Sequence, residues 1–285
     1  MDDVTMPAAV QDGDLPDLYR SGRAKRARAK RRRWISYGIG VVVAGAFVAT
    51  ADWSTLHEKY FDLAEMQKAF PKIVTVGVRN TLIYTAGAFV GGVIIGVIMM
   101  LLKRSEIRPY RWLGVTYIEV FRGLPALLTI LIVVFLTPLA FGWQFPEWFG
   151  IDVGGMLALA LVAGAYLAET LRAGIEGVPK GQVEAARSLG MSHATTLRVI
   201  VMPQAFRLVI PPLTNELVLL LKDTSLLAFV GSTTTTVELT QFARNQFVDS
   251  FNGSAMILAG ILYLVITIPM TQLVAHLERR NATRR

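Results

Sequence analysis

The stretch LIYTAGAFVGGVIIGVIMMLL (residues 82–102) contains no Asp, Glu, Lys or Arg. The hydrocarbon core of a bilayer is about 30 Å thick and needs about 20 mostly apolar helical residues to cross it, so this stretch predicts a membrane-spanning helix. The composition agrees, because 53% of the 285 residues are hydrophobic and only 18% are charged. A soluble domain is ordinarily less apolar than this. The sequence therefore predicts an all-α integral membrane protein.

Five further runs have the length of a membrane span. Three of them are as free of charged residues as the first, and the other two contain a few ionisable side chains. The six predicted spans are residues 35–51, 82–102, 124–142, 153–175, 208–230 and 255–277.

Lys and Arg are distributed unevenly between the segments that connect these spans. With the N-terminus placed in the cytoplasm, the inner segments hold 22 of these residues and the outer segments hold five. Cytoplasmic loops carry an excess of basic residues, so a multi-pass protein with both termini in the cytoplasm is predicted. The basic run RAKRARAKRRR (residues 23–33) directly precedes the first span, which favours attraction to anionic lipid over a nucleic-acid partner.

The chain divides into four predicted segments. Residues 1–33 are charged and lack apolar periodicity, so they are expected to form a disordered basic cytoplasmic tail. Residues 34–78 contain an anchor helix and an external segment with the pattern of an amphipathic surface helix. Residues 79–277 hold the other five spans and form the predicted core, and residues 278–285 form a short cytoplasmic tail.

The cytoplasmic segment between the fourth and fifth spans, with its approach to the fifth, reads GIEGVPKGQVEAARSLGMSHATTLRVIVMPQAFRLVIPP. Good helix formers predict a short helix over residues 182–189. Glu184 and Arg187 are three residues apart and are expected to pair on it. Gly190 is placed to end this helix in a left-handed conformation, and Ser192 is placed to cap a second one. Two short helices joined by a sharp bend are therefore expected.

This segment carries a family resemblance. It resembles the signature loop of the permease subunits of bacterial ABC importers, in which the loop docks on the ATPase. The matching residues are Glu184, Ala185, Ala186, Gly190, Ile200 and Pro203, the last of which is expected to close the second helix. Further phrases resemble the branch that imports polar amino acids: VRNTLIYT, EVFRGLPALL, AYLAETLRAGI, VPKGQVEAARSLGMS and VMPQAFRLVIPPLTNELVLLLKDTSLL.

The resemblance implies a fold, partners and a location. The fold would be the type I ABC importer permease core, built from five of the six helices. The partners would be two ATPase subunits, a second permease of the same or a homologous kind, and an extracytoplasmic solute-binding protein. The substrate would be an amino acid, and the location would be the bacterial plasma membrane. ATP and Mg would be used by the ATPase, with no cofactor in this subunit.

The resemblance also implies that four residues make the ATPase contact: Glu184, Ala185, Ala186 and Gly190. The alternative is that the loop is only a well-capped pair of cytoplasmic helices. The chain has no GxxxxGK[ST] sequence, so it is not expected to be the ATP-hydrolysing component or an enzyme. Two other functions remain open, a secondary transporter coupled to an ion and a membrane scaffold without transport activity.

Ionisable residues within the spans are costly and usually face a bundle interior or a water-filled cavity. Glu216 and Asp223 are seven residues apart, and Asn215 and Lys222 share that spacing, so each pair lies nearly on one helical face. They form a polar stripe on the translocation pathway or its gate, or they contain an internal ion pair of Lys222 that fixes helix packing.

Glu169 and Arg172, three residues apart near the inner end of the fourth span, allow the same two interpretations, with packing favoured. The chain has no Cys, and its three His residues are scattered, so no metal site is predicted.

Overall fold

The computed structural model describes residues 17–231 and 233–282. It divides into two compact units, residues 1–55 and residues 56–285, each of which is described by itself. In the first unit, α1 (Asp17–Thr50) is a single helix that begins inside the predicted disordered tail. Ala, Arg and Lys are good helix formers, which explains why the helix extends into the basic run. The remainder of the predicted tail, residues 1–16, lies outside the described residues.

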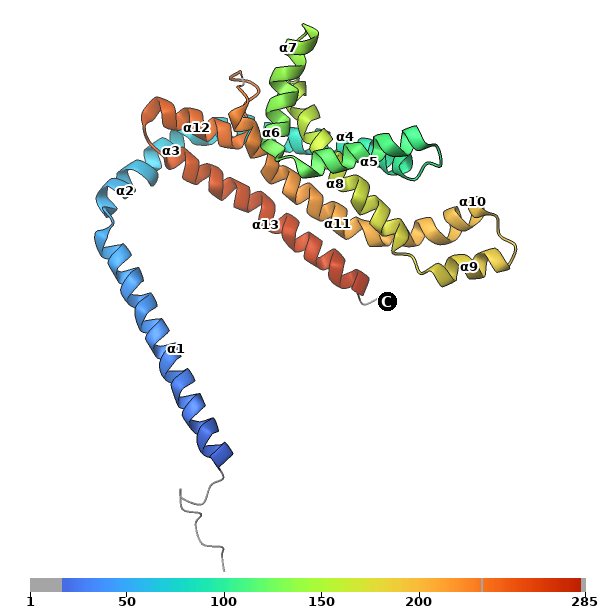
Figure 1. Ribbon diagram of the computed structural model, residues 1–285. Helices are drawn as coiled ribbons and strands as arrows, with labels where there is room; N and C mark the ends of the chain where they lie inside the picture. The colour runs from blue at the N-terminus through green and yellow to red at the C-terminus, as the bar shows by residue number, and fades with distance from the viewer. Residues whose placement is uncertain (1–16, 232, 283–285) are drawn as a thin grey trace, which may run out of the picture. The chain divides into compact units, whose positions relative to one another are not determined.

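The second unit is almost entirely helical (Figure 1). Its four long helices are α4 (Arg79–Lys103), α8 (Val153–Glu176), α11 (Met202–Asp223) and α13 (Ser254–Ala282). The shorter helices are α2 (Trp53–Tyr60), which begins in the first unit, α3 (Leu63–Lys72), α5 (Arg108–Gly123), α6 (Ala126–Leu131), α7 (Thr137–Phe141), α9 (Lys180–Ser188), α10 (His193–Thr196) and α12 (Leu239–Ser250). Strands β1 (Glu147–Trp148) and β2 (Ile151–Asp152) form an antiparallel pair.

Two predicted boundaries lie inside helices. The external segment contains α2 and α3, and α3 continues through a π-helical turn, η1 (Ile73–Val78), directly into α4. There is consequently no break between residues 78 and 79. At the other end, α13 continues to Ala282, so the predicted C-terminal tail begins as helix.

Helices α4 and α8 form the centre of the second unit, and small residues allow them to approach closely. A Cβ atom added to Gly92 would lie 3.1 Å from Ala163 Cβ, and one added to Gly96 would lie 3.0 Å from the backbone N of Ala168. These two glycines therefore allow α4 and α8 to pack closely within the chain. Tyr84, Leu159 and other apolar side chains of the two helices complete the buried core.

Helix α5 packs against α4 through Gly114, where a side chain would collide with backbone. A Cβ atom there would lie 2.6 Å from Lys103 N and 2.8 Å from Met99 O. We therefore expect Gly114→Ala to force α5 away from α4 and to lower the free energy of unfolding by about 1–3 kcal/mol. Thermal unfolding of the purified chain in detergent measures this effect. Gly123→Ala is the matched control, because its Cβ meets nothing within 4 Å, and equal stability of the two variants would contradict the prediction.

The predicted span 124–142 is helical from residue 126 to residue 141 and follows a sharp bend. The axes of residues 108–123 and 126–141 differ in direction by 113°. The bend occurs because Pro125 pushes the preceding residue, Leu124, out of the helical region, to φ −86° and ψ 143°. Helix α5, which is amphipathic and carries several charges, was not predicted.

Length and composition alone do not confirm all six predicted spans among the described residues. In the described residues, four helices are long and apolar enough to cross a membrane, or five if the bent pair counts as one span. Helix α11 is not among them, because Arg207, Glu216, Lys222 and Asp223 interrupt its apolar sequence. The described part of the chain is therefore mostly helical, with four to five apolar helices.

Hydrogen bonds connect the segment before α12 to the start of α4. The Asn80 side chain donates hydrogen bonds to the carbonyl oxygens of Thr235 and Val237, at 2.7 and 3.0 Å. Glu238 is fully buried and caps α12 by accepting from the backbone N–H of Gln241. Burial raises the pKa of the Glu238 carboxyl above its ordinary value, although the hydrogen bonds that it accepts from the backbone N–H groups of Thr240 and Gln241 lower it. The network fixes the polar loop over the α4–α8 core.

Candidate functional site

The segment between α8 and α11 forms a helical hairpin that projects from the ends of these helices (Figure 1). The predicted first helix is confirmed as α9. Gly190 has φ +81°, and the backbone N–H of Met191 donates to Ala186 O at 3.1 Å, the hydrogen bond that closes a helix with a left-handed residue. Ser192 caps α10 by accepting from Thr195 N at 3.1 Å. The predicted left-handed end and the predicted cap are both confirmed.

Two local expectations about this hairpin are wrong. Arg187 does not pair with Glu184, because its guanidinium donates instead to the carbonyl oxygen of Met191 at the end of the turn. Pro203 does not close the second helix, since the helix continues through a π-helical turn, η3 (Leu197–Val201), into α11. Pro203 lies directly after this π-helical turn, as the second residue of α11.

The expected docking residues do not share one face of α9. Glu184, Ala185 and Gly190 are exposed, whereas Ala186 is buried with only 5% of its surface accessible. Val183 and Ala186 are three residues apart on the inward side of an amphipathic helix, so Ala186 packs on its own chain. Its burial does not fit its expected role in the ATPase contact.

Leu189, which sequence analysis did not single out, is 84% exposed at the tip of the hairpin. The sequence does indicate this exposure, because Leu189 lies between Ser188 and Gly190, where the amphipathic pattern of α9 has already ended. A large apolar side chain in this position is suited to insertion into a partner protein.

Glu169 lies between two cations near the inner end of α8. Its Oε1 is 2.7 Å from Lys103 Nζ at the end of α4, and its Oε2 is 2.8 Å from Arg172 Nη2. Arg172 also pairs with Glu176 one turn further along α8. These contacts join α4 to α8 and favour the packing interpretation of Glu169 and Arg172.

Glu216 and Asp223 come together at a small pocket between α6, α8 and α11. Both carboxyl-bearing residues line it, together with Tyr166 and apolar residues of α8 and with Ala126 of α6. The pocket has a volume of about 20 Å³, close to the space of a single water molecule. The acidic pair is therefore assembled, while the pocket is closed to any larger solute in this conformation.

Asn215 and Lys222 face elsewhere. Both are exposed and neither lines the pocket. In the described part of the chain, Lys222 has no carboxylate within ion-pairing distance, so the structure does not contain the internal ion pair of the packing interpretation. The spacing of seven residues placed each pair on one face, but only the face of Glu216 and Asp223 turns toward α8. This arrangement favours the pathway interpretation for the acidic pair, which stays a prediction.

A cation also lies beside the pocket. The guanidinium carbon of Arg122, at the end of α5, is 5.7 Å from the centre of the Tyr166 ring, within the range of a cation–π interaction. Arg122 and Tyr166 were missed as site residues. The sequence gives little indication of this contact, because the two residues lie 44 positions apart and come together only through the bend after α5.

Comparison with known proteins places the chain in a family. The sequence profile of the family described as "Binding-protein-dependent transport system inner membrane component" matches residues 88–283. The L-cystine transport system permease protein TcyB of Bacillus subtilis (strain 168) is 34% identical over 223 residues, which are 77% of this chain and 90% of that protein. The probable glutamine ABC transporter permease protein GlnM of the same organism is 33% identical over 204 residues, covering 72% and 91%.

A solved structure has a similar fold. It belongs to an amino acid ABC transporter crystallised with histidines, and the similar chain is 34% identical, with a TM-score of 0.69. The similarity covers 77% of the present chain and 98% of the solved one. The type I permease fold implied by the sequence is therefore supported along most of the second unit.

Proposed function

Because this chain belongs to the family of binding-protein-dependent transport system inner membrane components, we propose that it carries amino acids across the membrane as one half of the pathway of an ABC importer. As a member of this family it is a transmembrane permease subunit. The observation that carries the substrate class is the similarity to permeases named for L-cystine and glutamine, over 77% and 72% of the chain.

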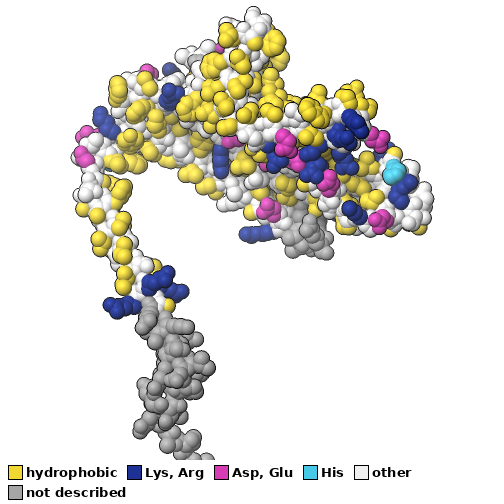
Figure 2. Space-filling model, viewed as in Figure 1, with side chains coloured by type: hydrophobic (Ala, Val, Ile, Leu, Met, Phe, Trp, Pro, Cys, Tyr) yellow, Lys and Arg dark blue, Asp and Glu magenta, His cyan; other side chains and the backbone are white. Residues whose placement is uncertain are grey.

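The proposed topology has six spans in a bacterial plasma membrane, with both termini in the cytoplasm. The sixth span is α11, whose charges are accommodated because Glu216 and Asp223 face the pocket and not lipid. Figure 2 supports the orientation, since Lys and Arg side chains gather where the α4–α5 turn and the ends of α8 and α9 lie. Basic residues prefer the cytoplasmic side.

The hairpin of α9 and α10 is the proposed docking element for the ATPase. Glu184, Ala185, Leu189 and Gly190 form its exposed contact, with ATP and Mg bound by the partner and not by this chain. The other proposed partners are a second permease, the same or homologous, and an extracytoplasmic solute-binding protein. Movement of the ATPase subunits would be transmitted through the hairpin, because residues 177–179 join α9 to α8 and α10 continues through η3 into α11.

Glu216 and Asp223 form the proposed polar stripe of the pathway. An amino acid carries an ammonium group that these carboxylates can bind and a carboxylate that Arg122, beside Tyr166, can bind. The pocket of about 20 Å³ is too small for an amino acid, so helices α6, α8 and α11 must separate during transport. ATP-driven movement of the docking hairpin would cause that separation.

Uptake into vesicles tests this function. Vesicles that contain the chain with its ATPase, second permease and binding protein are expected to accumulate labelled L-cystine, glutamine or another amino acid. Uptake should require ATP on the cytoplasmic side and should stop when the ATPase is withheld. Uptake that an ion gradient drives without the ATPase would identify a secondary transporter, and failure to accumulate any amino acid would favour a scaffold.

A further inference from the structure

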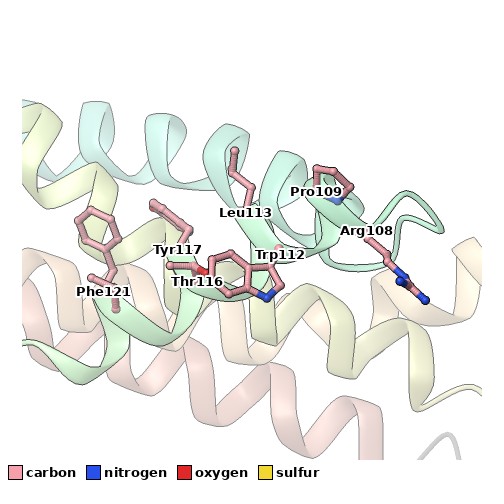
Figure 3. Close-up of a pocket in the computed structure, with 8 residues that line it drawn as sticks. Arg108, Pro109, Trp112, Leu113, Thr116, Tyr117 and Phe121 are labelled. Carbon is pink, nitrogen blue, oxygen red and sulfur yellow. The ribbon is translucent and has the colours of Figure 1, made fainter.

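An apolar groove runs along the outer face of α5 (Figure 3). It has a volume of about 710 Å³, and its walls include Trp112, Leu113, Val120 and Phe121. Trp112 is 76% exposed and Leu113 is 53% exposed. A face of this kind in a membrane protein is covered by lipid or by another protein, because water around it is unfavourable.

The groove is fixed in shape by contacts behind it. The Tyr117 hydroxyl donates to the carbonyl oxygen of Leu161 on α8 at 2.6 Å, and the Tyr117 and Phe121 rings lie 4.6 Å apart. Gly114, on the opposite side of α5, is held against α4. The groove therefore exists before any ligand binds, which reduces the entropy cost of binding.

The length of the groove matches one leaflet of a bilayer. Arg108 stands at one end and Phe121 at the other (Figure 3), which at 1.5 Å per helical residue is about 20 Å. One leaflet contributes half of a hydrocarbon core of about 30 Å, and Arg108 would lie just beyond that, at the level of the lipid headgroups. This placement rests on the proposed topology, in which the α4–α5 turn is cytoplasmic.

Charge is concentrated at the Arg108 end. In the described part of the chain, the Arg108 guanidinium has no hydrogen-bond or ion-pair partner, and it points away from the groove wall at the start of α5 (Figure 3). Arg104 and Arg111 stand nearby in the sequence, with Glu106 as the acidic residue of the turn. A long apolar groove with unpaired positive charge at one end is complementary to a lipid with an anionic headgroup.

We propose that this groove binds a phospholipid of the cytoplasmic leaflet, with an acyl chain along Leu113, Val120 and Phe121 and an anionic headgroup at Arg108. The apolar wall binds any acyl chain, and Arg108 supplies the preference for negative charge. Such a lipid supports α5 on the side opposite α4 and covers the helix that leads into the bend before the pocket.

Lipid retention by the full chain tests the proposal independently of transport. The purified chain in mild detergent is mixed with equal amounts of phosphatidylglycerol and phosphatidylcholine, and bound lipid is counted by native mass spectrometry. The wild type is expected to prefer phosphatidylglycerol, and Arg108→Gln is expected to reduce this preference about fivefold. Arg108→Lys should keep it, as should the control Arg111→Gln, whose side chain does not line the groove. Thr116→Trp, which fills the groove, should reduce retention of both lipids.

Three results would overturn the proposal. The first is an unchanged preference in Arg108→Gln, and the second is equal retention of the two lipids by the wild type. The third is a disulfide between two copies of Val120→Cys, which would place a second chain on the groove; the natural sequence has no Cys, so such a cross-link is unambiguous. None of these measurements uses ATP or an amino acid, so failure here is separate from failure of the uptake experiment.

Discussion

Replacing Leu189 with aspartate is expected to weaken association with the ATPase subunit by about 30-fold, the effect of losing one hot-spot residue that contributes about 2 kcal/mol. ATP-driven uptake should fall to a similar extent. Leu189 is 84% exposed, so its replacement removes no contact from the fold. The left-handed conformation of Gly190, with φ +81°, turns the chain sharply after Leu189 and leaves that side chain at the tip.

The measurement is a titration of the permease, in detergent, with its ATPase. Leu189→Met is the matched control, since it keeps an apolar side chain of similar volume and is expected to bind almost as well as the wild type. Membrane abundance of both variants should equal that of the wild type. Normal ATPase binding by Leu189→Asp at equal abundance would show that the tip of the hairpin is not the docking contact.

Local backbone rules predicted much of this hairpin. The short helix, the left-handed Gly190 and the Ser192 cap depend on residues within a few positions of one another, so their sequence determines them. Which side of α9 meets the rest of the chain depends on helices that are distant in sequence. Ala186 was therefore misplaced, and the exposure of Leu189 was missed, although the helix itself was predicted correctly.

The same distinction applies to the spans and the charges within them. Long apolar runs identified the membrane helices because the bilayer requires them. Helix α5 was not predicted, because charged residues on its other face interrupt the apolar run in the sequence. The ion pair of Lys103 with Glu169 joins residues 66 positions apart. No helical spacing could predict that contact, whereas the three-residue spacing did predict the pair of Glu169 with Arg172.

Neutralising both Glu216 and Asp223, as Glu216→Gln with Asp223→Asn, is expected to lower amino acid uptake by about 100-fold while ATPase binding is retained. A hydrogen bond to a charged group contributes about 1.5–3 kcal/mol, and both carboxyl-bearing residues line the same pocket as Tyr166. Isosteric amides keep the shape of the side chains, so the change tests charge and not packing. Uptake is measured in vesicles at matched membrane abundance.

Glu169→Gln is the control that separates a pathway charge from a structural one. Glu169 is held between Lys103 and Arg172, so its amide should lower the unfolding temperature while uptake per folded protein remains near that of the wild type. The double variant at Glu216 and Asp223 should behave in the opposite way, because the structure places no cationic partner within ion-pairing distance of either carboxylate among the described residues. Unchanged uptake by the double variant would remove both residues from the pathway and would leave the closed pocket as a packing feature of α8 and α11.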